Sequence, residues 1–278
     1  TQDILHRLEL CELEDENAGR LAYKLREVRR QRREAKDRID QTAPVEYYTL
    51  GQEVWKTAEN WPVPETRVTH LYLDSDGHAN TSAGDGRLAF AKPERENCDG
   101  YAYDPENPSQ HIIDMSENEI EVPEDYTREE LRQDLLCYTS PVLKEDLVLT
   151  GDMTAELYIS SDAPDTDFVV RVTDVDENGR SIKLADGLLS ARYRNGFARS
   201  EFMQEGEIVC LKIRTTKLSN CFRKGHRIRV TVTSSAKNFI FPNSNTREGF
   251  ASARTVVAHN RVYHGGLHAS RLTVRVEP

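Results

Sequence analysis

Short β-type runs separated by turn residues are the feature that most constrains how this chain folds. From Pro44 onward, runs rich in Val, Ile, Leu, Thr and Tyr are punctuated by Gly, Pro, Asn and Asp. Many such strands, with no helices interleaved among them, indicate a β-sandwich or jelly roll. The predicted strands are residues 45–50, 69–73, 147–159, 167–175, 187–193, 208–218, 227–233, 255–263 and 270–276.

Side-chain alternation identifies one core face of the predicted sheet. Ile228, Val230 and Val232 alternate with polar residues in the run 227–233, so they point to the same face and we expect that face to be core. The run 169–175 alternates in the same way and leads into Asn178-Gly179. An Asn-Gly pair supplies the positive φ values of a tight hairpin turn, so a hairpin is predicted there.

Two other segments differ in amino-acid composition from the predicted strands. The first 40 residues lack proline, are rich in Leu, Glu, Arg and Lys, and carry apolar residues at helical spacing, which predicts two helices broken near residues 17–19. The basic run 20–40 would suit an acidic partner, but a solvated helix packed on a neighbouring domain is the preferred interpretation. Residues 97–146 are interpreted as a long connection wrapping the sandwich, with a short helix at 128–137.

Charge, hydropathy and cysteine content bound the partners and the location. The net charge of -10 argues against nucleic acid as a partner, and the apolar runs are too short to cross a membrane. The five cysteines are odd in number and contain no C-x-x-C pair, which favours reduced thiols in the cytoplasm. Because the chain begins with Thr1, we expect it to be a processed, trimmed or partial form of a longer protein.

From about Pro44 to its end, the chain resembles the C-terminal region of the cocaine esterase and X-prolyl dipeptidyl peptidase (CocE/NonD) family of serine hydrolases. No single match suffices, but the matches recur in family order. They are PVEYYTLG at 44–51, Trp55, Trp61-Pro62, LYL at 71–73, GDG at 84–86, YDPENP at 103–108, LCYTSP at 136–141, Thr150-Gly151, SSDAPDTDF at 160–168, DGLLSARYR at 186–194, SSA at 234–236, PNSNT at 242–246 and HASRL at 268–272.

The resemblance implies a mainly β chain with three parts. Residues 1–41 look like a helical cap segment, 42–66 like the terminal piece of an α/β-hydrolase core, and 67–278 like a jelly-roll β-sandwich of the galactose-binding type. In this family the cap precedes the acid and base of the catalytic triad. In this chain the cap is joined directly to the last hydrolase strand near Asp40 and Gln41. The segment that should hold the catalytic acid and base is therefore omitted.

The chemistry of that family is missing from this chain. A serine hydrolase needs its nucleophile on a strained turn, usually G-x-S-x-G, and no such motif occurs. We therefore assign no catalytic residue and expect no cofactor. Structural roles are preferred for the serines and histidines that would otherwise be candidates: Ser82, Ser190, Ser234, Ser235, His70, His78, His259, His264 and His268.

Two groups of residues stay open as weak binding candidates. Asp162, Asp165 and Asp167 offer carboxylates to a hard cation, although the pattern lacks the features of a calcium loop and a turn-capping role is preferred. Tyr47, Tyr48, Trp55 and Trp61 would line an acyl pocket, or else pack at a domain interface.

Two functions follow from these observations. In the first, the chain is the C-terminal jelly-roll part of an esterase or X-Pro dipeptidyl peptidase. It shapes the active site or an oligomer and is inactive alone, because a hydrolase-core segment or partner chain supplies the nucleophile. In the alternative, it is a non-catalytic module that binds carbohydrate or another ligand. A hydrolase remnant should expose an apolar patch for its missing domain, whereas a glycan binder should expose coplanar aromatic rings.

Overall fold

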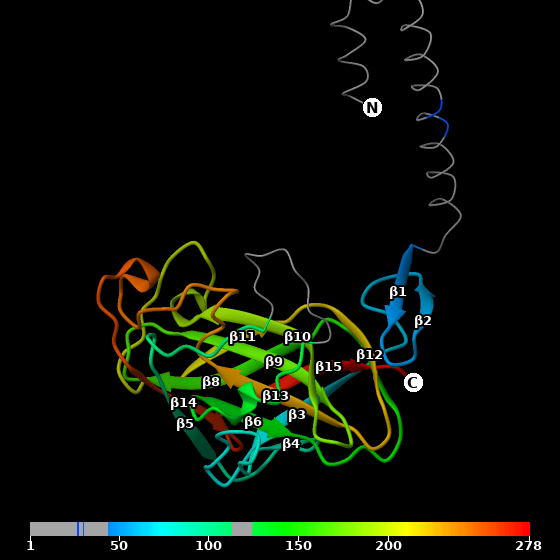
Figure 1. The fold of residues 1–278 in the computed structure, drawn as a ribbon, viewed down its shortest axis with the longest axis horizontal. Coiled ribbons are helices and arrows are strands. Elements are labelled where there is room, and N and C mark those ends of the chain that lie inside the picture. The colour runs from blue at the N-terminus through cyan, green and yellow to red at the C-terminus, as the bar shows by residue number, and fades with distance from the viewer. Residues whose placement is uncertain (1–26, 28–29, 31–43, 113–123) are drawn as a thin grey trace, which may run out of the picture. The chain divides into compact units, whose positions relative to one another are not determined.

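The computed structural model describes residues 44–112 and 124–278, together with Glu27 and Arg30 (Figure 1). The helices predicted for residues 1–41 lie outside this range, except that Glu27 and Arg30 are helical and form an ion pair of 2.6 Å. The chain divides into two compact units, residues 1–46 with 56–60 and residues 47–55 with 61–278.

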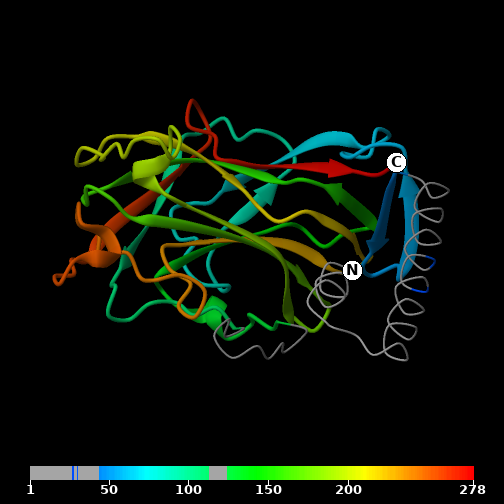
Figure 2. The ribbon, with the colours of Figure 1, turned by 90° about the horizontal axis from the view of Figure 1, so that it is seen from above.

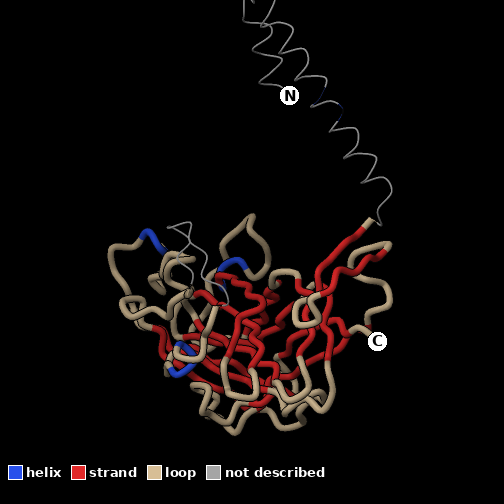
Figure 3. Tube along the Cα trace, turned by 45° about the vertical axis from the view of Figure 1, so that its right-hand side comes forward, coloured by secondary structure: helices blue, strands red, loops and turns tan. Residues whose placement is uncertain are grey.

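Strands are the main regular secondary structure of the described chain (Figure 3). β1 and β2 form a two-stranded sheet, and the other thirteen strands form one sheet with the path β10-β9-β13-β6-β4-β3-β15-β8-β14-β5. β11 pairs with β8, and β7 pairs with both β12 and β15. The elements are β1 (Val45–Thr49), β2 (Val54–Ala58), β3 (Arg67–Asp74), β4 (Arg87–Ala89), β5 (Asn97–Tyr103), η1 (Glu129–Leu131), β6 (Leu135–Thr139), β7 (Leu147–Gly151), β8 (Thr154–Ser161), β9 (Asp167–Val175), β10 (Ser181–Ser190), η2 (Ala191–Tyr193), β11 (Val209–Arg214), β12 (Leu218–Phe222), β13 (Arg227–Thr233), η3 (Gly249–Ala251), β14 (Ala258–His264) and β15 (Arg271–Val276).

The predicted β-sandwich is confirmed, and its core follows the predicted alternation. Ile228, Val230 and Val232 are all buried, as are Val170 and Val172 of the neighbouring strand β9. These side chains belong to one continuous apolar cluster that also takes in residues of β3, β8, β11 and β15. The strands of the large sheet can be followed from two directions in Figures 1 and 2.

Two predicted strands are each two strands in the structure. The run 147–159 is divided between β7 and β8. In the run 208–218, β11 covers residues 209–214, and β12 begins at the last residue, Leu218. Gly151 ends β7 with a φ of +143°, a conformation that side-chain-bearing residues rarely adopt. β7 and β8 both pair antiparallel with β15, so Gly151 marks an irregularity within one strand path rather than a reversal of the chain, and hydrophobic content alone does not reveal it.

The predicted helix at 128–137 is wrong. A single 3-10 turn, η1, occupies residues 129–131, and β6 follows as a strand. β6 pairs antiparallel with β13, and Leu135, Leu136 and Tyr138 are fully buried. Tertiary pairing with β13 overrides the local helical preference of this segment.

The long connection is shorter than predicted, because β5 and β6 occupy both of its ends. Its described part covers the outward face of β9, β10 and β13. Tyr126 donates its backbone N–H to Ser181, and its ring lies 3.8 Å beneath the guanidinium carbon of Arg171. Glu130 is fully buried and pairs with Arg229. Both faces of β9 and β13 are therefore buried: apolar residues cover one face and polar residues cover the other.

The predicted hairpin joins β9 to β10 through residues 176–180. Asp176 and Arg180 are linked through their backbones, and the Asp176 carboxylate accepts hydrogen bonds from the N–H groups of Asn178 and Arg180. Gly179 adopts a φ of +82°, whereas Asn178 is not among the residues with positive φ. The loop is therefore a three-residue hairpin with a left-handed glycine rather than the two-residue turn expected from Asn-Gly.

Candidate functional site

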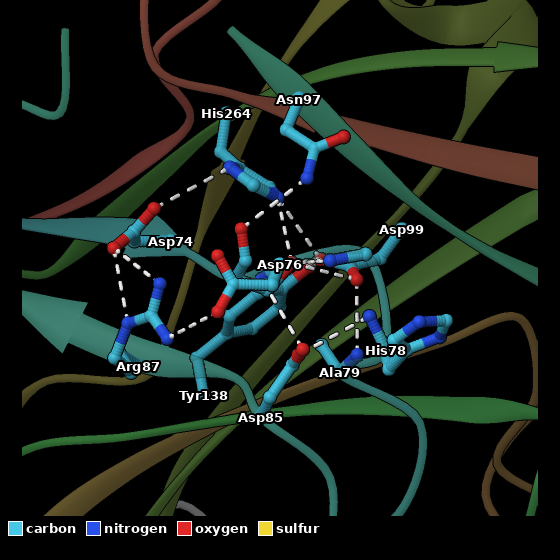
Figure 4. A network of polar contacts seen from close by, with 12 residues as sticks. Asp74, Asp76, His78, Ala79, Asp85, Arg87, Asn97, Asp99, Tyr138 and His264 are labelled. Atoms are coloured by element: carbon cyan, nitrogen blue, oxygen red, sulfur yellow. Dashed lines mark hydrogen bonds and ion pairs between the residues drawn. The ribbon is translucent and has the colours of Figure 1, made fainter. Parts of the chain in front are cut away.

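A Ser, a His and an Asp do come together in the described chain. Figure 4 shows Asp99 and His264 in a polar network, to which Ser75, at the start of the loop that follows β3, also belongs. The Ser75 Oγ lies 3.0 Å from His264 Nε2, and Asp99 Oδ2 lies 3.1 Å from the same nitrogen. Asp99 and His264 are fully buried, and Ser75 is nearly so.

The geometry of this network does not suit nucleophilic catalysis. In a catalytic triad the histidine holds the serine with one ring nitrogen and the acid with the other. Here both partners share Nε2, and the Ser75 hydroxyl donates directly to the Asp99 carboxylate at 2.8 Å. The nearest carboxylate to the other ring nitrogen, Nδ1, belongs to Asp74 at 3.9 Å, which is too far for the hydrogen bond that orients a catalytic histidine, and burial denies a substrate access.

The network instead fixes the loop between β3 and β4. The Asp99 carboxylate also accepts hydrogen bonds from the backbone N–H of Ala79 and the hydroxyl of Tyr138, both at 2.9 Å. Burial by itself raises the pKa of Asp99, but the bonds from His264, Ala79, Ser75 and Tyr138 outweigh it and hold that pKa below its usual value. Asp99 is thus an ionised, fully bonded anchor at the centre of the loop.

The other candidate serines and histidines have separate partners. Ser234 bonds to Tyr101 and Asn260, and Ser235 accepts the backbone N–H of Ser109. His259 contacts Asp162, His268 contacts Glu96, and His70 contacts Thr273. Ser82 donates its backbone N–H to Glu130, and His78 is exposed and donates its backbone N–H to Asp85. Ser190 is half-buried at the end of β10.

The four aromatic candidates form two pairs. Tyr47 and Trp61 meet edge to face at 6.0 Å, and the Trp61 indole donates to Asp152. Tyr48 and Trp55 meet at 5.3 Å. Because Tyr47 and Tyr48 are neighbours on β1, their side chains point to opposite faces of that strand. The structure therefore does not gather all four side chains around one space.

An exposed apolar patch lies where the second pair is found. We call Tyr48, Leu50 and Trp55 the β1–β2 patch; all three side chains are exposed, Trp55 by 67%, whereas the exposed Val54, the neighbour of Trp55 on β2, points to the opposite face. A two-stranded sheet is only marginally stable by itself in water. Three exposed apolar side chains within eight residues are typical of a surface that meets another protein segment.

The three candidate acids do not converge on one point. Asp162 bonds to the exposed His259, whereas Asp165 accepts from the backbone and side chain of Arg192. The Asn243 amide bridges Asp165 and Asp167 at 2.7 and 2.9 Å. Within residues 44–112 and 124–278, no group of three His, Cys, Asp or Glu side chains is arranged to hold a metal ion.

A second set of exposed aromatic rings lies on the loops around Asp165 and Asp167. Phe241 and Phe250 are exposed by 79% and 75%, and their nearly parallel rings are 6.0 Å apart. Together with Tyr193 they line a cavity of about 150 Å³ whose wall also includes Asp165 and Asp167. The sequence analysis missed these phenylalanines, because a single phenylalanine in a loop carries no periodic signal.

The fold defines a class of protein: a mainly β domain built around one large sheet. The family model for the X-Pro dipeptidyl-peptidase C-terminal non-catalytic domain matches residues 37–273. The chain belongs to this family.

Individual relatives agree with this assignment. A cocaine esterase of Rhodococcus sp. strain MB1 Bresler is 35% identical over 239 residues, which cover 84% of this chain and 41% of that protein. The chain thus spans about two fifths of the length of this relative. An aminopeptidase from a marine sediment Thaumarchaeota archaeon shares the fold with a TM-score of 0.76, at 24% identity, over 85% of this chain and 41% of that one.

A third comparison extends the likeness of fold. An α-amino acid ester hydrolase superposes with a TM-score of 0.75, at 22% identity, over 84% of this chain and 41% of that one. Among the residues that are described here, no helix has the length and apolar character needed to span a membrane.

Proposed function

We propose that this chain is the C-terminal jelly-roll part of a serine acyl hydrolase of the esterase or X-Pro dipeptidyl-peptidase type. Its nucleophile lies outside the chain, on an α/β-hydrolase segment. In this proposal residues 1–41 are cap-like, 42–66 complete the hydrolase core and 67–278 form the sandwich. The location is cytoplasmic, a proposal supported by the free thiols of Cys98, Cys137 and Cys210.

The β1–β2 patch is the observation that carries this proposal. Tyr48, Leu50 and Trp55 belong to residues 42–66, the piece expected to complete the hydrolase core, and their apolar side chains face solvent. A catalytic α/β segment adjoining this sheet would bury them. The length of the Rhodococcus relative supports this occupant, because most of that esterase lies outside the region matched here. Docked in this way, the sandwich would form one wall of the active site or a contact between subunits.

A chimaera tests the docking. The matched region of the Rhodococcus esterase is replaced by this chain, and ester hydrolysis and thermal stability are measured. Trp55→Asp should lower the midpoint of thermal unfolding and the activity, because a charge would be buried at the contact. Phe197→Asp is the matched control, since Phe197 is 80% exposed and lies far along the chain from the β1–β2 patch. Equal stability and activity of both variants would remove the basis of the proposal.

The isolated chain provides a second test. A fluorophosphonate probe bonds only to activated serines, so we expect intact-mass spectrometry to show no adduct on this chain. A single adduct would show that the chain contains a nucleophile after all.

The alternative, a galactose-binding-like module that binds carbohydrate or another ligand, is favoured by one observation. Phe241, Phe250 and Tyr193 surround a cavity on loops at the edge of the sandwich, and Asn243 and Asp167 provide polar groups there. Binding of sugars to the isolated chain, undiminished by Trp55→Asp, would favour this alternative over the hydrolase proposal.

A further inference from the structure

The cavity between Asp165, Asp167 and the three aromatic rings is not used by the proposed docking function. Its volume is about 150 Å³, and three loops contribute to it. Residues 165–167 precede or begin β9, Ser190, Arg192 and Tyr193 come from the end of β10 and from η2, and residues 241–250 come from the loop that ends in η3. The wall consists of Asp165, Asp167, Ser190, Arg192, Tyr193, Phe241, Asn243, Glu248, Gly249 and Phe250.

The charges of this wall are not balanced. Asp165, Asp167 and Glu248 are acidic and Arg192 is the one base among the lining residues, so the net charge is 1 - 3 = -2. The Arg192 guanidinium is engaged by Asp165 of the same wall, because its Nε donates to Asp165 at 2.7 Å, and its Nη2 donates to the carbonyl of Thr246 at 3.1 Å.

Of the two buried carboxylates of the wall, Asp165 forms an ion pair with Arg192, whereas Asp167 forms none within the described residues and feels the Arg192 charge only at longer range. Asp167 is 6% exposed, and its hydrogen bond comes from the neutral amide of Asn243. Burial raises the pKa of Asp167 above its usual value, although the bonds from Ser190 and Asn243 act against this. A buried carboxylate at a cavity wall favours a positively charged occupant, because such an occupant would replace the hydration that burial removes.

The aromatic walls select the type of cation. Ring faces attract organic cations such as ammonium and guanidinium groups, and the attraction strengthens where water is excluded. A bare metal ion suits the cavity poorly, because it requires several oxygen ligands and the Asp165 oxygens already accept three hydrogen bonds. A neutral sugar would leave the charge of Asp167 uncompensated.

We propose that this cavity binds a small organic cation, an alkylammonium or guanidinium group, with Asp167 as its counter-ion and Tyr193, Phe241 and Phe250 as its walls. This inference does not depend on the hydrolase proposal, because the β1–β2 patch shares no residue with the cavity.

Titration of the isotope-labelled chain with methylguanidinium and methylammonium, followed by NMR, tests the proposal. Methylurea has nearly the same shape as methylguanidinium without its charge, so it should shift the signals around the cavity far less. Asp167→Asn should weaken methylguanidinium binding at least about tenfold. Asp162→Asn is the matched control, because Asp162 carries a similar charge but is not part of this wall, and it should leave binding unchanged.

Phe250→Leu keeps the proposal testable if Asp167→Asn fails to fold, because Phe250 is largely exposed. Loss of the ring face should weaken binding about three- to tenfold. Equal binding of methylurea and methylguanidinium, or full binding by Asp167→Asn or by Phe250→Leu, would overturn the proposal. A short blocked peptide that contains arginine separates two sources of the cation. Tighter binding of this peptide than of methylguanidinium assigns the cavity to a side chain of a protein partner, and weaker binding assigns it to a free cation.

Discussion

Among the polar residues of the loop network, Asp99 should contribute most to the free energy of unfolding, and Asp99→Ala tests this. The substitution removes the acceptor of hydrogen bonds from Ser75, Ala79, Tyr138 and His264, all at 2.8 to 3.1 Å and all in buried surroundings. Each buried donor left without a partner costs about 1–3 kcal/mol. The costs do not add fully, because Ser75 and His264 still contact each other and the desolvation of the carboxylate is also relieved. We therefore expect a loss of about 3–5 kcal/mol in the free energy of unfolding.

Urea unfolding followed by circular dichroism measures this loss, with the slope checked for a change in two-state behaviour. Asp76→Ala is the control, because Asp76 is exposed and bonds through its side chain to Arg87 alone among the described contacts (Figure 4). We expect its unfolding midpoint to stay unchanged. If Asp99→Ala loses less than about 1 kcal/mol, the network does not anchor the loop.

The same network predicts a pH dependence of stability. Since the pKa of Asp99 is lower in the folded chain than in the unfolded chain, its contribution is present above the unfolded pKa and is lost as the pH falls through the folded pKa. Acid should therefore narrow the difference in stability between the unmodified chain and Asp99→Ala. A difference that stays constant down to the lowest pH of the folded state would contradict this account.

Three further predictions concern other sites. Gly86→Ala places a Cβ 2.0 Å from the Cys137 carbonyl and should destabilise by about 3 kcal/mol, whereas Gly179→Ala has open space but a positive φ and should cost about 1 kcal/mol in urea unfolding. Burial raises the pKa of Asp186, but His111 and Lys183 outweigh burial and hold that pKa below its usual value. Asp186→Asn should therefore lose less stability than the unmodified chain as the pH falls, as thermal unfolding against pH would show. Burial raises the pKa of the Cys137 thiol further than the pKa of the Cys98 and Cys210 thiols, so iodoacetamide should modify Cys98 and Cys210 before Cys137, as peptide mass mapping would show.

The sequence predicted the strands whose alternation and turns are local. β9 and β13 have the predicted bounds, because each is a continuous β-branched run with a clear turn or charged boundary. β6 was missed for the opposite reason, since its residues favour a helix locally and form a strand only through pairing with β13. The residues alone therefore did not indicate this pairing.

The candidate sites also differ in whether local sequence could reveal them. The absence of a G-x-S-x-G motif was readable from the sequence, but the meeting of Ser75 with Asp99 and His264 joins residues up to 189 positions apart and has no local signal. The cavity at Asp167 depends likewise on three loops that come together only in the fold. Tyr48 and Trp55 were singled out from the sequence, yet their exposure was not readable from it.

Alternation along a strand tells which side chains share a face, but not what that face meets. On β9, Arg171 and Thr173 occupy the polar face, which sequence reasoning would place in water, and both are buried. Tyr126 and Glu130 of the connection cover that face, and Glu130 bonds to Ser181 at 2.7 Å. Truncating these covering residues should therefore expose charged groups rather than apolar ones and leave the apolar core intact. Replacement of Tyr126 by Ala should then lower the unfolding midpoint without increasing the binding of a hydrophobic dye, and a rise in dye binding would show that the connection is part of the apolar core.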